Sequence, residues 1–277
     1  MTEIPIFPLR SVLCPGVALP LHIFEDRYRL MIGRCIERGE PFGVVLLREG
    51  AEVGALHGEV AAVGTTAAIR RAGAYPDGRL DILTVGQQRF RLEAIDRVSE
   101  PYLLGRVSLL DEPTGPEAEL RARAQQVGQR FLEYLELLQP AGDPDGPEIE
   151  IEFEIEVADG DADETPAAGA SSGAAEAGDA GGTVDAASDD ASPVQRREML
   201  MAAARRLIGT DDPTALSYVL TALIQVDLSA RQELLEAPDT VERLARLDGL
   251  LDRESWFLKQ GLRPIIIDAG RARSHRG

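Results

Sequence analysis

The first 110 residues carry short apolar runs separated by turn signals, which is the pattern of a β domain. Residues 42–47 (FGVVLL) are continuously apolar, and residues 89–95 alternate polar and apolar side chains. The first pattern is typical of a buried strand, and the second of a strand with one face in solvent. Further strands are expected over residues 4–9, 65–71, 79–85 and 102–110. The first of these contains prolines, which favour an edge position, and the series as a whole predicts a small barrel or sandwich.

One helix is expected inside this β region, over residues 25–37. Its apolar positions follow the helical spacing i, i+3, i+4, i+7, i+8: Tyr28, Met31, Ile32, Cys35 and Ile36. Such a stripe is the face that a helix packs against a core. Gly39 and Pro41 then end the helix.

From residue 114 the apolar spacing becomes helical. Thr114 and Glu117 have the spacing of a capping box, with Pro116 in the first turn of a long helix that stops before Pro140. Helical spacing returns after residue 193 and continues to residue 260, where Asp212 and Asp239 precede two of the expected helices. This second region is predicted to be a helical bundle.

Between the helical regions lies an acidic stretch of a different composition. Residues 142–192 hold sixteen of the 47 acids and no Lys or Arg, which leaves 31 acids and 29 bases elsewhere. Residues 148–157 (EIEIEFEIEV) alternate strictly and fit either a strand or a charged extended tract. Residues 158–192 contain almost nothing that could be buried, so they cannot offset the entropy of ordering and are expected to be disordered.

These patterns predict an α+β chain with five parts. They are a β domain over residues 1–113, a long helix over 114–141, a largely disordered acidic insert over 142–193, a helical bundle over 194–260 and a tail over 261–277. The net charge of −18 comes almost wholly from the insert. The rest is nearly neutral, which argues against a nucleic-acid binder because such a protein needs a basic face.

Residues that carry chemistry are sparse. The single lysine, Lys259, lies outside any glycine-rich phosphate loop, and the three histidines His22, His57 and His275 are scattered. His22 fits a structural role best. No spacing fits a metal site, so we expect no catalytic residue, no cofactor and no enzyme activity. The two cysteines, Cys14 and Cys35, are expected to be buried free thiols. The chain shows neither a secretory leader nor a membrane-spanning run, which favours the cytoplasm.

Several motifs closely resemble the N-terminal, substrate-binding domain of Lon proteases. The opening motif is the most specific: residues 6–10 (IFPLR), 15–16 (PG), 19–25 (LPLHIFE) and 27–28 (RY). Residues 42–47, 64–65, 77–79, 89–90 and 101–102 continue the resemblance in order, as do Gln232, residues 234–236, residues 242–244, Leu250 and Glu254. It covers residues 4–141 and 194–258, without the ATPase or peptidase parts of the full protease, so a stand-alone member is expected.

The resemblance implies a PUA-like β pseudo-barrel followed by helices, and recognition of exposed or unfolded polypeptide segments. The expected partners are extended polypeptides and, for a proteolysis adaptor, a protease or chaperone, with no nucleic acid and no membrane. Two alternatives remain open: an RNA-binding module, because PUA-like barrels often bind RNA, and a scaffold whose acidic insert docks basic partners.

Two apolar residues beside turns mark a candidate peptide-binding surface. Tyr75 precedes residues 76–78 (PDG), a good hairpin turn, and Leu13 precedes residues 14–16 (CPG). Hairpin tips face water, so an aromatic residue there is hard to bury. If both side chains are exposed, they form an apolar patch of the kind that marks an interaction site. The alternative is that both pack back onto the barrel.

Overall fold

The computed structural model describes residues 2–49, 58–138 and 201–262, apart from 203, 207 and 210. The strands are β1 (Thr2–Leu9), β2 (Ala18–Ile23), β3 (Phe42–Glu49), β4 (Glu59–Ala74), β5 (Leu80–Asp96) and β6 (Leu103–Leu109). The helices whose two ends both lie within the described residues are α1 (Asp26–Arg38), α2 (Glu117–Leu138), α4 (Pro213–Leu223), α5 (Leu228–Leu235) and α6 (Thr240–Lys259). The acidic insert, with both interpretations of residues 148–157, lies outside the described residues.

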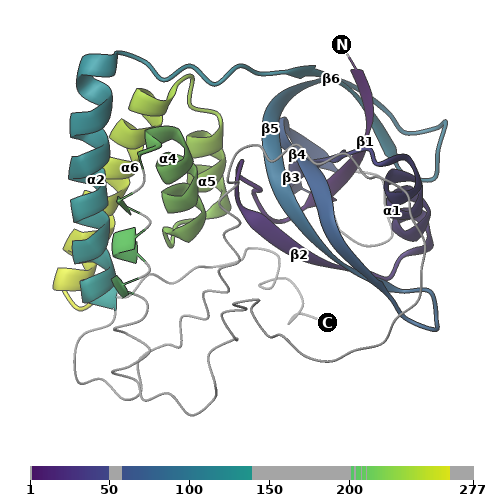
Figure 1. Ribbon diagram of the computed structural model, residues 1–277, viewed down its shortest axis with the longest axis horizontal. Helices are drawn as coiled ribbons and strands as arrows, with labels where there is room; N and C mark the ends of the chain where they lie inside the picture. The colour runs from purple at the N-terminus through teal and green to yellow at the C-terminus, as the bar shows by residue number, and fades with distance from the viewer. Residues whose placement is uncertain are drawn as a thin grey trace, which may run out of the picture.

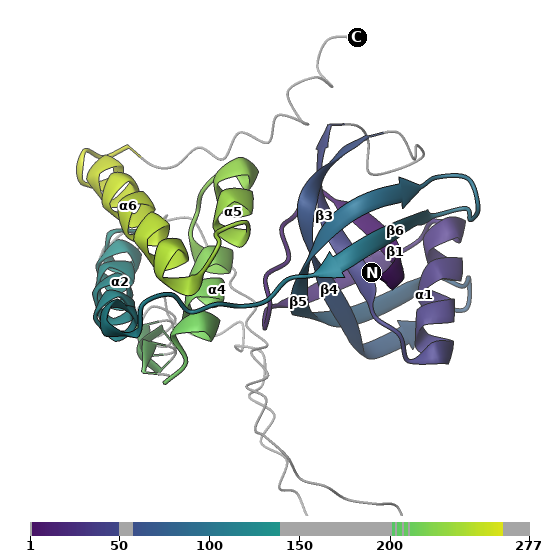
Figure 2. The same cartoon turned by 90° about the horizontal axis from the view of Figure 1, so that it is seen from above.

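The strands form one sheet that closes on itself. Its order is β2-β5-β4-β3-β1-β6, and β5 also pairs with β6, so that five strands make a ring and β2 lies outside it. Figures 1 and 2 show this ring on one side of the molecule and the helices α2, α4, α5 and α6 on the other. The α+β architecture, a barrel with one helix followed by a helical part, is therefore confirmed.

Two strand predictions are wrong in detail. The first strand, β1, lies between β3 and β6 and is not an edge strand, although Pro5 and Pro8 leave two of its ladder positions without a donor. Residues 79–85 and 89–95 are parts of a single strand, β5. Gly86 lets that strand pass close to the Cys14 carbonyl without interruption, because a side chain there would collide with this oxygen.

The length of β5 gives the sheet an extension beyond the ring. Its first part, from Leu80 to Val85, pairs with β2, and its last part, from Phe90 to Asp96, pairs with β6. The end of β4, from Ala68 to Ala74, pairs with β5 on one side only, because the β3 ladder stops at Ala67. In Figure 1 the β4–β5 hairpin projects beyond the barrel at the lower right.

One face of the extension packs on α1, as the apolar stripe predicted. Tyr28, Met31, Ile32 and Cys35 are buried in one cluster with Phe7, Ile23 and Ile82. Ile36 was included in the stripe, but it is 44% exposed. It is the last apolar residue of α1, in the final turn before Gly39, whose left-handed conformation ends the helix.

Gly33 gives a direct test of helix propensity in α1. A Cβ atom added at Gly33 meets nothing within 4 Å, and its φ is not in the left-handed region. The substitution Gly33→Ala should therefore raise the free energy of unfolding by about 0.5–1 kcal/mol, since glycine costs backbone entropy in a helix. Urea denaturation followed by circular dichroism measures it. A lower denaturation midpoint for the variant would contradict the expected open environment of this position.

The helical part has its own core and is capped mainly by aspartates. Asp212, Asp227 and Asp239 each accept hydrogen bonds from the first-turn N–H groups of α4, α5 and α6. The predicted capping box at Thr114 is wrong, because α2 begins at Glu117 and the Thr114 carbonyl instead accepts from the N–H of Val241 at 3.1 Å. The segment before α2 therefore provides a hydrogen-bond acceptor for a backbone N–H group at the start of α6.

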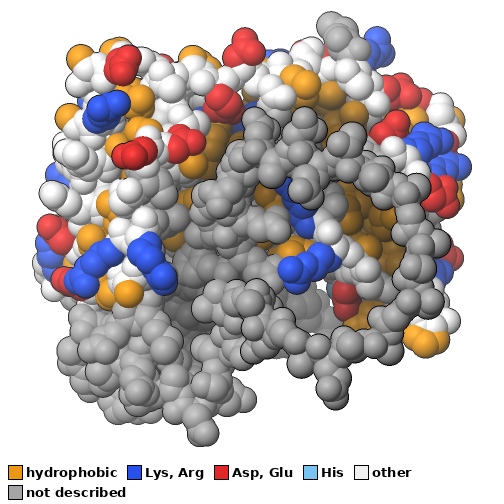
Figure 3. All heavy atoms as spheres, in the orientation of Figure 1, with side chains coloured by type: hydrophobic (Ala, Val, Ile, Leu, Met, Phe, Trp, Pro, Cys, Tyr) orange, Lys and Arg blue, Asp and Glu red, His pale blue; other side chains and the backbone are white. Residues whose placement is uncertain are grey.

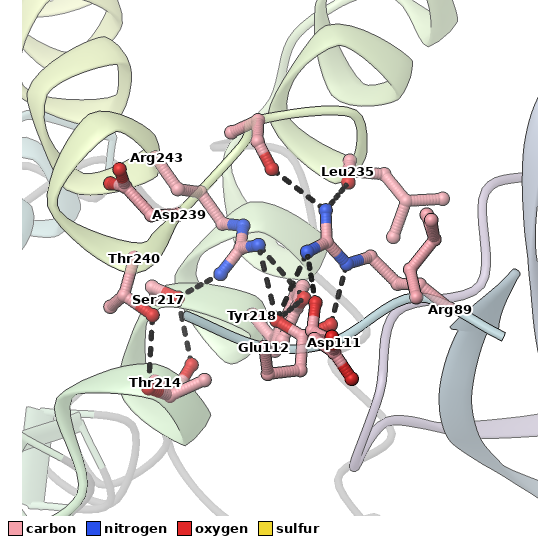
Figure 4. A network of polar contacts seen from close by, with 12 residues as sticks. Arg89, Asp111, Glu112, Thr214, Ser217, Tyr218, Leu235, Asp239, Thr240 and Arg243 are labelled. Carbon is pink, nitrogen blue, oxygen red and sulfur yellow. Dashed lines mark hydrogen bonds and ion pairs between the residues drawn. The ribbon is translucent and has the colours of Figure 1, made fainter. Parts of the chain in front are cut away.

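A buried polar network joins the barrel to the helices (Figure 4). Arg89 of β5 contacts Glu112 at 2.5 Å and donates to the carbonyls of Leu235 and Ala237 at 2.8 and 2.7 Å. Tyr218 of α4 donates to Glu112 at 2.6 Å. Arg243 of α6 lies within 3.6 Å of the same carboxylate. We call these four residues, Arg89, Glu112, Tyr218 and Arg243, the junction.

The environment of the junction makes its contacts costly to remove. The Arg89 and Arg243 side chains are buried, and the Arg243 guanidinium also stacks 3.8 Å from the Tyr218 ring centroid. Burial raises the pKa of the Tyr218 hydroxyl. An apolar cluster surrounds the network from both sides: Val12, Cys14, Leu46, Ala61, Val63, Tyr218 and Leu235. Both cysteines are buried free thiols, as predicted, and burial raises the pKa of Cys14 to about 12.

Candidate functional site

The second face of the sheet extension is open to solvent and carries a compact group of side chains. His22 of β2 lies opposite Asp81 of β5, and its Nδ1 is 2.5 Å from an Asp81 carboxylate oxygen. The Tyr75 hydroxyl donates to the other oxygen of the same carboxylate. Asp81 is therefore held from two sides, and the hydrogen bonds from Tyr75 and then His22 lower its pKa.

The aromatic rings of His22, Phe24 and Tyr75 lie next to one another on this face, together with the guanidinium of Arg79. The His22 ring centroid is 6.2 Å from that of Phe24 and 6.0 Å from that of Tyr75. The guanidinium of Arg79 lies 5.3 Å from the Tyr75 centroid, and its Nη1 is 3.5 Å from His22 Nε2. Phe24 is 51% exposed and Tyr75 is 43% exposed. We call Phe24, His22, Tyr75, Arg79 and Asp81 the aromatic surface.

The hairpin turn fixes the position of Tyr75. The N–H of Gly78 donates to the Tyr75 carbonyl at 2.9 Å, and the N–H of Tyr75 donates to the Arg79 carbonyl at 2.9 Å. Gly78 has φ +83°, which suits glycine in a turn of this kind. Arg29 of α1 also donates to the Asp77 carbonyl at 3.0 Å. The predicted turn at residues 76–78 is confirmed, and it is anchored to the helix beneath.

Asp77 completes the turn by binding Arg79, the second residue after it. Its carboxylate accepts from the Arg79 N–H at 3.1 Å and from Arg79 Nε at 2.7 Å. These hydrogen bonds lower the pKa of Asp77. These contacts place the Arg79 guanidinium over the Tyr75 ring.

Apolar side chains continue the open face away from the hairpin tip. Pro20 lies opposite Leu83, and Ala18 lies opposite Val85, on the same side as His22 and Asp81 because side chains alternate along a strand. Pro20 is exposed, while Leu83 and Val85 are half-buried and belong to none of the four core clusters. Figure 3 shows hydrophobic side chains, in orange, beside Lys or Arg side chains, in blue, at the surface of the β part.

Of the two residues predicted for the binding surface, only Tyr75 is exposed. Leu13 is 3% exposed and packs in the cluster with Tyr28 and Phe42. Its carbonyl accepts a hydrogen bond from the Thr65 hydroxyl at 2.7 Å, and Pro15 bridges to Gly86, so this turn lies against the barrel. Leu13 therefore cannot contribute to a surface patch, and its placement there was wrong.

Phe24 and His22 were not predicted to be part of the surface, although a signal for them exists. Leu19, Leu21 and Ile23 point toward the core, so the strand period of two places His22 and Phe24 on the other face. His22 was interpreted as a structural histidine, and its side chain is in fact exposed. Its contact with Asp81, 59 residues away, could not be read from the local sequence.

The rest of the described structure adds no reactive constellation. Lys259 is the last residue of α6 and is exposed. Over residues 2–49, 58–138 and 201–262, no three His, Cys, Asp or Glu side chains come together in a way that could hold a metal ion. None of the helices in these ranges has the length and apolar character that a membrane span requires.

A barrel followed by a helical part is a fold that also occurs in a solved structure. The structure is similar to the N-terminal domain of Mycobacterium avium complex Lon protease, with a TM-score of 0.55 and 16% sequence identity over 91% of this chain and 98% of that one. The sequence profile of the ATP-dependent protease La (LON) substrate-binding domain matches residues 3–253. The chain belongs to this family.

The full-length relatives are much longer than this chain. It is 33% identical over 135 residues to the Lon protease of Parabacteroides distasonis, and 31% identical over 140 residues to that of Porphyromonas gingivalis. These matches cover 48% and 49% of this chain, but only 16% of either relative. The matched region is the substrate-binding part of those proteases and includes neither their ATPase nor their peptidase domain.

Proposed function

We propose that this chain is a non-catalytic module that binds extended or unfolded polypeptide segments in the cytoplasm, and that it presents them to a protease or chaperone. The observation that carries the proposal is the aromatic surface. The rings of Phe24 and Tyr75 are exposed to solvent there, so a bound partner could cover their apolar area. Membership in a family of substrate-binding domains supports the same proposal. An exposed apolar face with ordered polar groups at its rim is the usual form of an interaction site.

The polar contacts of the surface favour a peptide with apolar side chains. Asp81 is already bound by His22 and Tyr75, and Arg79 is bound by Asp77. Their charges are thus largely satisfied, and the remaining contact area is supplied by the rings of Phe24 and Tyr75. Stacking and burial of these rings are the main source of affinity expected here.

Substituting the two exposed rings tests this site. The wild-type protein should bind labelled peptides rich in aliphatic and aromatic residues with a Kd of about 1 μM, or about −8 kcal/mol. The variants Tyr75→Ser and Phe24→Ser should each weaken binding by about tenfold, since each removes a ring from the contact. Fluorescence anisotropy measures the affinities.

A matched control comes from Val98, which is 91% exposed in the β5–β6 turn, away from the aromatic surface. Val98→Ser should bind as the wild type does. If wild-type protein binds none of the peptides, the polypeptide-binding role is wrong. If it binds and all three variants bind equally, another surface is responsible. Displacement of bound peptide by single-stranded RNA at comparable concentration would instead favour the RNA-binding alternative.

A further inference from the structure

The sheet extension has two outer edges, and they differ in what they offer another chain. The first is the side of β4 that faces away from β5, from Ala68 to Ala74. Among the described residues no strand pairs with it, because the β3 ladder ends at the Phe42–Ala67 pair. The second is the outer side of β2, which pairs only with β5 in the described sheet. An unpaired sheet edge is a template for a further strand.

The ladder shows which groups of β4 point outward. The N–H of Tyr75 donates to the Arg79 carbonyl, and the register continues without a shift through the pairs Ala74–Leu80, Gly73–Asp81 and Ala72–Ile82. Hydrogen-bonded pairs alternate along an antiparallel ladder, so Gly73 faces β5 as Tyr75 does. The N–H and C=O groups of Ala72 and Ala74 therefore face outward.

The outer edge of β2 is blunted by proline. The N–H of Gly86 donates to the Val17 carbonyl, and the same alternation then turns the backbone groups of Ala18, Pro20 and His22 outward. Pro20 has no N–H, so the middle of this edge cannot donate a hydrogen bond to an added strand. Proline on an exposed edge is a common protection against unwanted pairing.

The outer edge of β4 lacks such protection. Residues 70–74 are all exposed, and Ala72, Gly73 and Ala74 have no bulky side chain that would keep another strand away. A Cβ atom at Gly73 would come no closer than 3.9 Å to another atom, so the glycine is not demanded by packing within the chain.

We infer that an extended polypeptide binds by adding a strand along β4 at Ala72–Ala74. This inference rests on the proposed polypeptide-binding function and gives its mode. Hydrogen bonding to main-chain groups is nearly independent of sequence, which suits a module that must accept many unrelated segments.

Strand addition can be tested on the wild-type protein by modifying the backbone of a bound peptide one position at a time. The probe is a labelled peptide of about ten residues that alternates glutamate and valine, the length of a long strand. Methylating one backbone nitrogen at a time should weaken binding by about tenfold at every second position and leave the positions between nearly unchanged, because only alternate N–H groups face β4. Fluorescence anisotropy gives each affinity.

Paired proline variants test the edge itself. Ala72→Pro and Ala74→Pro each remove an outward N–H of β4, whereas Ala18→Pro makes the same change on the outer edge of β2. None of the three takes a donor from the ladders with β5. The β4 variants should bind the peptide about tenfold more weakly, and Ala18→Pro should bind as the wild type does. Circular dichroism and thermal unfolding show that each variant is folded.

The outcomes separate this inference from the function on which it rests. Binding by the wild type that tolerates methylation at every position would overturn strand addition and leave polypeptide binding intact. The same holds if a folded Ala72→Pro protein binds as tightly as Ala18→Pro. No binding of any peptide would overturn the proposed function, and strand addition with it.

Discussion

Replacing Glu112 with glutamine should lower the free energy of unfolding by about 3–5 kcal/mol, since breaking one partner of a buried ion pair leaves uncompensated charge. Glu112 is the one carboxylate within the junction, and it lies between Arg89 and Arg243, whose side chains are buried. Without its charge, no carboxylate of the junction balances the two buried guanidinium groups. The hydrogen bond from Tyr218 is weakened at the same time.

Thermal and urea unfolding measure this effect, with Glu119→Gln as the matched control. Glu119 also pairs with an arginine, Arg123, but at 3.4 Å on the exposed surface of α2. Surface pairs at this helical spacing contribute only about 0.3–0.5 kcal/mol. The two glutamine variants should therefore differ by several kcal/mol. If their unfolding midpoints agree, the junction does not stabilise the fold in the way its burial indicates.

A second large loss of stability is expected from Gly86→Ala, about 3 kcal/mol. A Cβ atom at Gly86 would lie 2.2 Å from the Cys14 carbonyl oxygen, and that oxygen is backbone, so it cannot rotate away. The surroundings are fixed as well: Gly86 donates its N–H to Val17 at 3.0 Å and accepts from the N–H of Gly16 at 2.8 Å. Relieving the collision requires separating β5 from the turn at residues 14–16.

The same measurement on Gly33→Ala provides the control for Gly86→Ala. Both variants add one methyl group to a glycine, but at Gly33 nothing lies within 4 Å of the new atom. The two changes should therefore have opposite signs, with Gly33→Ala slightly stabilising. A Gly86→Ala protein as stable as the wild type would mean that the Cys14 turn can move at little cost.

The sequence predicted elements wherever the deciding contacts are local. The turn at residues 76–78 followed from proline, aspartate and glycine in a suitable order, and α1 followed from its apolar spacing. The capping box at Thr114 failed because the segment meets the start of α6, more than 120 residues later. The prediction that Leu13 is exposed failed for a similar reason. The turn beside it suggested exposure, but Leu13 lies against the barrel, where its carbonyl accepts a hydrogen bond from Thr65.

The candidate site was predictable only in part. Tyr75 was identified because hairpin tips face solvent, and that argument needs no other part of the chain. Its neighbours, His22 and Asp81, depend on the pairing of β2 with β5, which is a long-range property. The open edge of β4 depends on where the β3 ladder ends, at Ala67. No pattern within β4 itself distinguishes its paired half from its unpaired half.

The junction also has a consequence for the synthesis of the protein. Arg89 binds carbonyl groups 146 and 148 residues further along the chain, so a ribosome completes the barrel long before these partners exist. Until then, Arg89 and the apolar residues Val12, Leu46 and Val63, all of which are buried in the complete protein, face water on the nascent barrel. We expect the emerging barrel to need protection by a chaperone until α4 and α5 cover this side, since exposed apolar surface promotes aggregation. A chain truncated after the barrel should consequently be far less soluble than the whole.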